Sequence, residues 1–317
     1  MSEGFISKLR PMFSWRVLRW VIRGMCVAVI AVYLHFYIYQ EYWLLEPKED
    51  PTGYQEKKDL EPAFTGWLSP PNEVLVSMDE SSSTSKVVIH IQKFRTSSKS
   101  QGVVLYFHGN KGNLYKCRWE IEPFLAAGYD VWTMDYRSFG ESSDGPLNEL
   151  ALVNDAEMFY KHVVTQQRVD EKDIVVWGRS FGSGIAASVA ANHSPRLLVL
   201  ETPYCSIPDT VRRTHWYLPL FLFRYRLPTD EYLDYVDCPV HLIHGTSDDK
   251  ISHKSSVAIM DRHDRPNRPV KLHSIKGGEH NLRDTSTLKE FIAKLKKILT
   301  PKKTVSDPPV HVITPRS

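Results

Sequence analysis

A serine flanked by glycines stands between a strand-like and a helix-like segment. Residues 174–177 (IVVW) form an apolar run typical of a short buried strand. The run continues into Gly178-Arg179-Ser180-Phe181-Gly182 and then into a segment rich in small residues. Between a strand and a helix, Gly-x-Ser-x-Gly forms a sharp, strained turn that exposes the serine hydroxyl above the sheet. Ser180 is therefore a candidate nucleophile, and the free N–H groups at the start of the helix suit a developing negative charge.

A nucleophilic serine needs a histidine as its base and an acid that orients the histidine. His280 lies in the glycine-rich loop GGEHN, directly after the last predicted strand. Asp248 follows the strand predicted at 239–244 and is the preferred acid, while Asp249 and Glu201 remain alternatives. Serine, aspartate and histidine thus occur in the chain order that a strand–turn–helix site of this type requires.

A second glycine-rich loop, HGNKGN at residues 108–113, follows the apolar run at 103–107. A loop of this kind could cradle phosphate, but the spacing GxxxxGK[ST] does not occur here. We expect the loop to supply one N–H group of an oxyanion hole, from Asn110, with Phe181 supplying the other. His108 precedes the loop, and we expect it to be structural.

Strand-like and helix-like segments alternate around these motifs. Strands are predicted at 86–94, 103–107, 129–134, 174–177, 196–200, 239–244 and 270–274, and helices at 115–127, 148–164 and 288–299. This alternation predicts an α/β fold with a doubly wound, mostly parallel sheet covered by helices on both faces. In such a sheet the ligand site lies at the carboxyl ends of the strands, which is where the motifs fall.

The alternation stops between about 203 and 236. Residues 214–228 (THWYLPLFLFRYRLP) are dense in aromatic and aliphatic side chains and include two arginines. We expect a short helical cap that offers an apolar wall to an acyl or similar substrate. A helix packed in the core is the alternative.

The N-terminal region predicts a membrane anchor. Residues 20–39 (WVIRGMCVAVIAVYLHFYIY) give about 30 Å of helix, enough to span a bilayer. Basic residues precede or open this segment and acidic residues follow it, so the positive-inside rule places the N-terminus in the cytoplasm. The rest of the chain would lie on the luminal, periplasmic or extracellular side. A buried core helix and a cleaved signal peptide are the alternatives, but no A-x-A-like cleavage site follows.

Composition narrows the function classes. The 317 residues carry a formal net charge of +3, and the four cysteines show no metal-ligand spacing. We therefore expect neither a nucleic-acid surface nor a structural zinc. The predicted organisation is a cytoplasmic N-terminus with an anchor at 1–45, a linker at 46–80, a catalytic domain at 81–300 and a disordered tail at 301–317.

The motifs HGNKGN, DYRSFGES, GRSFGSG, HGTSDD and GGEH, in this order, resemble the α/β-hydrolase superfamily over about residues 80–300. Within it the chain is most similar to the membrane-anchored α/β-hydrolase-domain proteins of the bud-emergence type. The resemblance implies that Ser180 is the nucleophile, that His280 is the general base and acid, and that Asp248 orients His280. It also implies that Asn110 and Phe181 give the oxyanion donors. The short cap departs from the long lids of triglyceride lipases, which argues against a bulk-lipid substrate.

The resulting hypothesis is a membrane-anchored, esterase- or lipase-like serine hydrolase. It would cleave ester or thioester bonds of small, acyl or lipid-like substrates through an acyl-enzyme on Ser180, with no metal and no organic cofactor. A peptidase or an acyltransferase of the same fold is an alternative. So is a non-catalytic binding module, or a membrane scaffold that acts through residues 214–228. The sequence indicates no particular protein partner.

Overall fold

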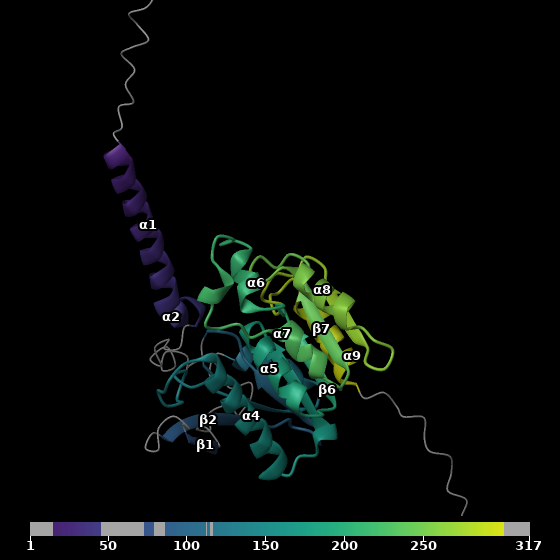
Figure 1. The fold of residues 1–317 in the computed structure, drawn as a ribbon. Helices are drawn as coiled ribbons and strands as arrows, with labels where there is room; N and C mark the ends of the chain where they lie inside the picture. The colour runs from purple at the N-terminus through teal and green to yellow at the C-terminus, as the bar shows by residue number, and fades with distance from the viewer. Residues whose placement is uncertain (1–14, 46–72, 79–85, 112, 115–116, 301–317) are drawn as a thin grey trace, which may run out of the picture.

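An eight-stranded sheet forms the centre of the molecule (Figure 1). The computed structural model describes residues 15–45, 73–78, 86–111, 113–114 and 117–300. The strands are β1 (Glu73–Met78), β2 (Lys86–Phe94), β3 (Val103–Phe107), β4 (Asp130–Met134), β5 (Ile174–Arg179), β6 (Leu197–Glu201), β7 (Val240–Gly245) and β8 (Val270–Ile275), in the spatial order β1-β2-β4-β3-β5-β6-β7-β8. The pairs β1–β2 and β2–β4 are antiparallel, and all other pairs are parallel.

Helices cover both faces because the central strands are apolar on both sides. All five residues of β3 are buried, and alternate residues belong to different halves of the core. The helices α4 (Glu149–Thr165), α5 (Phe181–Asn192) and α8 (His253–His263) contribute to the core on one face, and α3 (Arg118–Ala126) and α9 (Leu288–Leu299) to the core on the other. The predicted doubly wound, mostly parallel sheet is confirmed.

Two elements differ from the sequence prediction. Residues 73–78 of the predicted linker form β1, which pairs with residues 86–91 of β2. The linker prediction is wrong at these residues. An edge strand is held by hydrogen bonds to the neighbouring strand, so its own sequence needs no apolar periodicity. The helix α8 was not indicated by the sequence, since most of its side chains are polar. Residues 1–14, 46–72, 79–80 and 301–317 of the predicted organisation lie outside the described residues.

Short helices occupy the chain between β6 and β7. They are α6 (Ile207–Arg212), η4 (Leu220–Leu222), α7 (Thr229–Tyr232) and η5 (Leu233–Tyr235). Prolines at 208, 219 and 228 stand at or beside helix starts and keep the segment from forming one long helix. Several apolar side chains of this segment, among them Tyr225 and Leu227, join the core on the α5 side of the sheet. The segment is thus a cap of short helices with a core-facing side.

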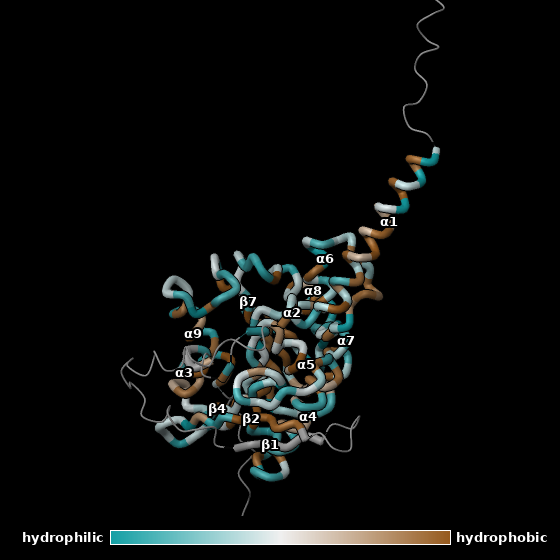
Figure 2. Tube along the Cα trace, turned by 90° about the vertical axis from the view of Figure 1, so that its left-hand side faces the viewer, coloured by the Kyte–Doolittle hydropathy of each residue, from teal (hydrophilic) through white to brown (hydrophobic). Residues whose placement is uncertain are grey.

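A long apolar helix extends from the domain. The helix α1 (Trp15–Ile38) is the one helix of the described chain whose length and composition suit a membrane span, and it contains no buried residue. The alternative of a buried core helix therefore does not hold. Figures 1 and 2 show α1 projecting away from the sheet, with α2 (Gln40–Leu44) at its base. Gln40 and Leu45 are buried against the domain.

Candidate active site

Ser180 lies on a strained turn between β5 and α5. Its backbone adopts φ 51° and ψ −119°, a region that side-chain-bearing residues rarely occupy. A Cβ atom added to Gly178 would clash with the carbonyl oxygen of Gly182. One added to Gly182 would clash with the carbonyl oxygens of Phe107 and His108 on β3 and the loop that follows it. Glycine is therefore required on both sides of the serine, and close packing holds the turn.

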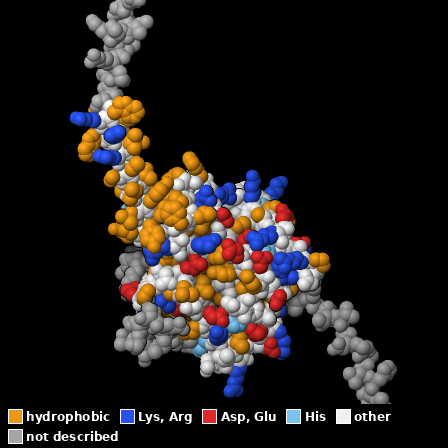
Figure 3. Space-filling view, in the orientation of Figure 1, with side chains coloured by type: hydrophobic (Ala, Val, Ile, Leu, Met, Phe, Trp, Pro, Cys, Tyr) orange, Lys and Arg blue, Asp and Glu red, His pale blue; other side chains and the backbone are white. Residues whose placement is uncertain are grey.

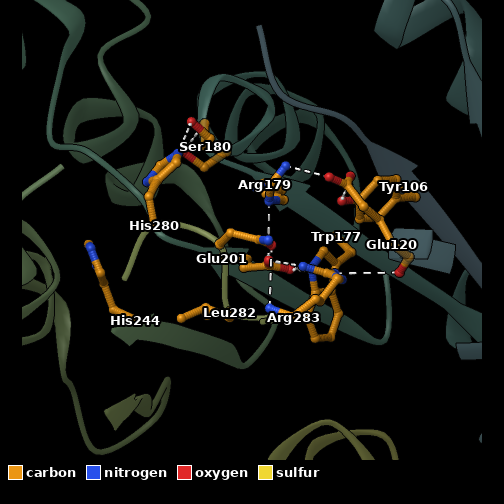
Figure 4. Close-up of polar contacts among 12 residues, drawn as sticks. Tyr106, Glu120, Trp177, Arg179, Ser180, Glu201, His244, His280, Leu282 and Arg283 are labelled. Atoms are coloured by element: carbon orange, nitrogen blue, oxygen red, sulfur yellow. Dashed lines mark hydrogen bonds and ion pairs between the residues drawn. The ribbon is translucent and has the colours of Figure 1, made fainter. Parts of the chain in front are cut away.

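The structure brings together the serine, the histidine and the preferred aspartate of the sequence prediction. The Oγ atom of Ser180 lies 3.0 Å from Nε2 of His280, and Figure 4 shows the two side chains pointing toward each other. Nδ1 of His280 lies 2.8 Å from Oδ2 of Asp248. Asp249 points elsewhere, with 69% of its side chain exposed and an ion pair to Lys250. The geometry therefore selects Asp248 over Asp249.

Asp248 also binds a second histidine, which sequence reasoning missed. Nε2 of His244 lies 3.1 Å from Oδ2 of Asp248, and Nδ1 of His244 lies 2.7 Å from Oγ of Ser256. The backbone N–H of Ile251 donates to the other carboxylate oxygen. Burial raises the pKa of Asp248, but the hydrogen bonds from His244 and His280 outweigh burial and hold the pKa below its usual value. Asp248 is therefore an anion that is already oriented toward His280.

The signal for His244 was its position. It is a polar residue at the carboxyl end of β7, between the apolar pair Leu242-Ile243 and Gly245. Its side chain is fully buried. Because Nε2 faces two acceptors, the carboxylate of Asp248 and the carbonyl of Ile251, this nitrogen carries the proton. The hydroxyl of Ser256 then donates to Nδ1.

The two predicted oxyanion donors lie on either side of Ser180. Phe181 is the first residue of α5, so its N–H has no acceptor within the helix. On the other side, a Cβ atom added to Gly109 would lie 3.9 Å from the Cβ of Ser180, which places the loop of Asn110 beside the serine. The side chain of Asn110 donates to the carbonyl of Leu44 at a distance of 2.8 Å. The end of α2 therefore contacts this loop directly.

Buried polar groups hold the loop at 108–113 in place. The hydroxyl of Tyr136 donates to the carbonyl of His108 at 2.9 Å, and Oδ1 of Asp135 accepts the N–H of Leu114 at 2.9 Å. Oδ2 of Asp135 accepts the N–H of Glu141 at 3.2 Å. Burial lowers the pKa of His108 to about 4 and raises the pKa of Asp135 to about 7. His108 is thus a neutral, buried residue, in keeping with a structural role.

A buried charge network lies beneath the serine and histidine (Figure 4). Glu201, the third candidate acid, accepts hydrogen bonds from Trp177 and Arg283 at 3.0 Å instead of contacting His280. Arg179 pairs with both Glu201 and Glu120. Burial raises the pKa of Glu201, but the two arginines and Trp177 outweigh this and lower it. Glu201 is therefore a structural anion.

This network joins three parts of the site that are distant in sequence. Arg179 directly precedes Ser180, and Arg283 lies three residues after His280. Glu120 belongs to α3, the helix that follows the loop at 108–113, and its carbonyl also accepts from Arg283 at 3.4 Å. The network thus fixes the serine turn, the histidine loop and α3 relative to one another. Within the described ranges, no three His, Cys, Asp or Glu side chains come together as metal ligands.

Comparison with known proteins supports the same fold. A family model described as the alpha/beta hydrolase fold matches residues 102–200, which include the loop at 108–113 and the serine turn. The chain is 30% identical over 176 residues to the lysophosphatidylserine lipase ABHD12 of Danio rerio, covering 47% of this chain and 44% of the relative. It is 26% identical over 212 residues to the alpha/beta hydrolase domain-containing protein 17C of Xenopus tropicalis, covering 65% and 64%. The chain therefore spans less than two thirds of the length of these relatives.

Solved structures show the fold at lower identity. The esterase Pf2001 of Pyrococcus furiosus superposes with a TM-score of 0.57 at 18% identity, covering 72% of this chain and 89% of the esterase. A soluble variant of the monoglyceride lipase of Saccharomyces cerevisiae, in complex with a substrate analogue, gives a TM-score of 0.54 at 15% identity, covering 73% and 95%. The sheet order, the glycine-flanked serine turn and these matches together show that the chain has the α/β-hydrolase fold.

Proposed function

We propose that the protein is a membrane-anchored serine hydrolase that cleaves carboxylic ester or thioester bonds of acyl or lipid-like substrates. The observation that carries this proposal is the continuous hydrogen-bonded chain from Asp248 through His280 to Ser180. Its three members come from separate loops at the carboxyl ends of β5, β7 and β8. A serine, a base and an orienting acid in this geometry are the requirements for nucleophilic acyl transfer.

In the proposed mechanism His280 first acts as a base. Nε2 of His280 takes the hydroxyl proton as the Oγ atom of Ser180 attacks the carbonyl carbon, and Asp248 stabilises the imidazolium that forms. The N–H groups of Asn110 and Phe181 would hold the tetrahedral oxyanion. Collapse of this intermediate expels the alcohol or thiol, which receives the proton from His280. Water then attacks the acyl-serine with His280 again as base, and the products are a carboxylic acid and free Ser180.

The substrate class rests on two supports. The relative from Danio rerio is named a lysophosphatidylserine lipase, and one solved structure of the same fold is a monoglyceride lipase. In addition, the cap between β6 and β7 is rich in aromatic and aliphatic side chains, which suit an acyl chain. Single-chain esters and thioesters therefore fit the proposal better than charged, water-soluble metabolites.

A substrate panel tests this function. The full chain in detergent micelles would be assayed with p-nitrophenyl esters of increasing acyl length, a monoacylglycerol, a lysophospholipid, an acyl thioester and a peptide amide. We expect hydrolysis of esters or thioesters, with a preference for longer acyl chains, and loss of this activity in Ser180→Ala. Equal hydrolysis by the folded variant, or cleavage of the amide alone, would refute the proposal.

The proposed topology places the hydrolase domain on the non-cytoplasmic side of a membrane. The support is the charge asymmetry around α1, which begins with Arg16, Arg19 and Arg23 and is followed by Glu41 and Glu46. A glycosylation or protease-protection reporter fused after Thr300 measures the side directly. We expect the reporter to be modified in the lumen or outside the cell. A reporter that is accessible only from the cytoplasm would show that the domain lies on the cytoplasmic side and would contradict the proposed topology.

A further inference from the structure

Four large apolar side chains of the cap face solvent. Trp216, Tyr217, Leu220 and Phe221 are 76%, 48%, 57% and 79% exposed, and we call these four residues the cap patch. Among the described residues after α2, the other exposed large apolar side chains, Leu150 and Tyr235, stand singly in the sequence. Large apolar side chains gathered on one exposed surface mark an interaction site more often than single ones do.

The cap patch is fixed beside the domain end of α1. The hydroxyl of Tyr33 donates to the carbonyl of Tyr217 at 3.2 Å, and the rings of Phe36 and Phe223 meet edge to face at 5.3 Å. Gln40 then binds the backbone on the other side of the patch, donating to the carbonyl of Leu222 and accepting from the N–H of Arg224. In Figure 3 hydrophobic side chains continue from α1 onto the adjacent face of the domain.

The length of α1 determines how deep in the bilayer these contacts lie. Its 24 residues extend over about 36 Å, whereas the hydrocarbon core of a bilayer is about 30 Å thick. If the helix is centred, about 3 Å protrudes at each end. Tyr33 lies five residues before the end at Ile38, or about 7.5 Å along the axis. Tyr33, and with it the backbone of Tyr217, therefore lies at or just inside the hydrocarbon boundary on the domain side.

The side chains of the cap patch suit this depth. Tryptophan and tyrosine concentrate at the membrane interface, where an apolar ring and a polar N–H or O–H are both satisfied. Leu220 and Phe221 supply purely apolar surface. Arg212 and Arg213, three to four residues before Trp216, are exposed and fit the phosphate groups of lipids at the same level.

We propose that the cap patch inserts into the leaflet that surrounds the domain end of α1. The protein then has two contacts with one bilayer, a spanning helix and an inserted part of the cap. This inference rests on the membrane span in the proposed function, but not on the reactivity of Ser180. Its consequence is that the hydrolase domain is held close to the lipid–water interface, so that an acyl substrate reaches it from the bilayer.

A site-specific fluorophore tests the insertion. Phe221→Cys, in a full chain that also carries Cys26→Ser and Cys205→Ser, would be labelled with an environment-sensitive dye and reconstituted into phosphatidylcholine vesicles. We expect blue-shifted emission, quenching by lipids with a nitroxide near the headgroup, and protection from aqueous iodide. The matched control is Tyr235→Cys, an exposed aromatic position at the last residue of η5, just before the amino end of β7. It should show the reverse pattern.

The label on native Cys26, in a Cys205→Ser chain, reports whether the middle of α1 lies in the bilayer. If Cys26 is quenched by lipid but position 221 remains open to iodide, the insertion is refuted and the span stands. If position 221 is protected from iodide but not quenched by lipid, a protein surface covers the patch and the insertion is again refuted. If Cys26 itself is in water, both the span and the insertion fail.

Activity gives a second readout that separates the insertion from the proposed function. We expect Phe221→Asp to lower the hydrolysis of an acyl ester embedded in vesicles several-fold more than the hydrolysis of a short soluble ester. Tyr235→Asp should change neither rate. Equal rates of Phe221→Asp and wild type on both substrates would count against the insertion. No hydrolysis by any of the three proteins would contradict the proposed function and leave the fluorescence result to decide the insertion.

Discussion

Asp248 accepts hydrogen bonds from two imidazoles, His244 and His280, while its neighbour Asp249 faces solvent. We predict that Asp248→Asn lowers kcat for ester hydrolysis by about 10³- to 10⁴-fold, because an amide neither fixes the tautomer of His280 nor stabilises its charged form. Asp249→Asn is the matched control and should retain activity. Steady-state kinetics of the two variants test this prediction. Similar losses of kcat in both variants would show that activity depends on the conformation of the loop and not on the carboxylate of Asp248.

Asp135 makes the stability of the fold depend on pH. Burial raises its pKa to about 7 in the folded protein, against about 3.9 in an unfolded chain. The folded state therefore holds this proton more tightly, so the stabilising contribution is complete below about pH 4 and is lost as pH rises through about 7. Asp135→Asn removes this contribution, because an amide does not titrate.

The measurement is urea unfolding of wild type and Asp135→Asn at pH 4.5 and pH 7.5. We subtract the free energy of unfolding of wild type from that of the variant at each pH. We expect this difference to be larger at pH 7.5 than at pH 4.5, which means that the variant is relatively more stable at the higher pH. A difference between the two proteins that stays the same at both pH values would show that Asp135 does not titrate in this range.

Short motifs in the sequence predicted the residues Ser180, His280 and Asp248, because each lies in a glycine-containing loop or turn at the carboxyl end of a predicted strand. Short motifs do not predict which side chains pair with the buried charges. Glu201 and Arg283 are 82 residues apart, and nothing in the sequence distinguishes Glu201 as an arginine partner from Glu201 as the acid of His280. Only the fold, which brings Arg283 into contact with Glu201 at the end of β6, decides between the two roles.

At the scale of elements, the ion pair between Glu201 and Arg283 connects the end of β6 to the loop that carries His280. We predict that Arg283→Leu destabilises the fold by about 3–5 kcal/mol, the usual cost of removing one partner of a buried pair. It should also lower kcat more than it raises KM, because the loop of His280 loses its anchor. Chemical unfolding and kinetics together test this role.

The matched control for Arg283→Leu is Arg262→Leu. Arg262 pairs with Asp230 and Asp234 at the surface, and loss of such a pair costs less than about 1 kcal/mol. If the two variants lost stability equally, or if Arg283→Leu left kcat unchanged, the network would not position the histidine loop.

Most elements followed from local patterns, and the exceptions have physical reasons. The central parallel strands β3, β5 and β6 are buried on both faces and are mostly continuous apolar runs, so their positions were predicted within two residues. The edge strand β1 depends on pairing with β2, which its own sequence does not reveal. The helix α8 buries Ser256, Ile259 and His263, a set with too little apolar character for a periodic signal.

At the scale of the whole molecule, α2 and the end of α1 nearest to it pack against the domain. Leu45, directly after α2, is 1% exposed and belongs to the main core, although it lies within the predicted anchor segment at 1–45. We predict that Leu45→Ala lowers the free energy of unfolding by about 2–5 kcal/mol, as for other buried leucines, and lowers the Tm of the detergent-solubilised protein. Leu34→Ala is the control, since Leu34 lies on the exposed surface of α1. Equal Tm values for the two variants would show that the domain folds independently of its N-terminal helices.

The central claim is that His280 and Asp248 activate Ser180 as a nucleophile. A fluorophosphonate tests it most directly, because this reagent forms a stable adduct with an activated serine and its product mimics the tetrahedral transition state. The full chain in detergent would be treated with the reagent and analysed by intact-mass and peptide mass spectrometry. We predict one adduct on Ser180, no adduct in Ser180→Ala and greatly slowed labelling in His280→Ala. A folded wild-type protein that takes no label, or a Ser180→Ala variant that is labelled as fast as wild type, would contradict the claim.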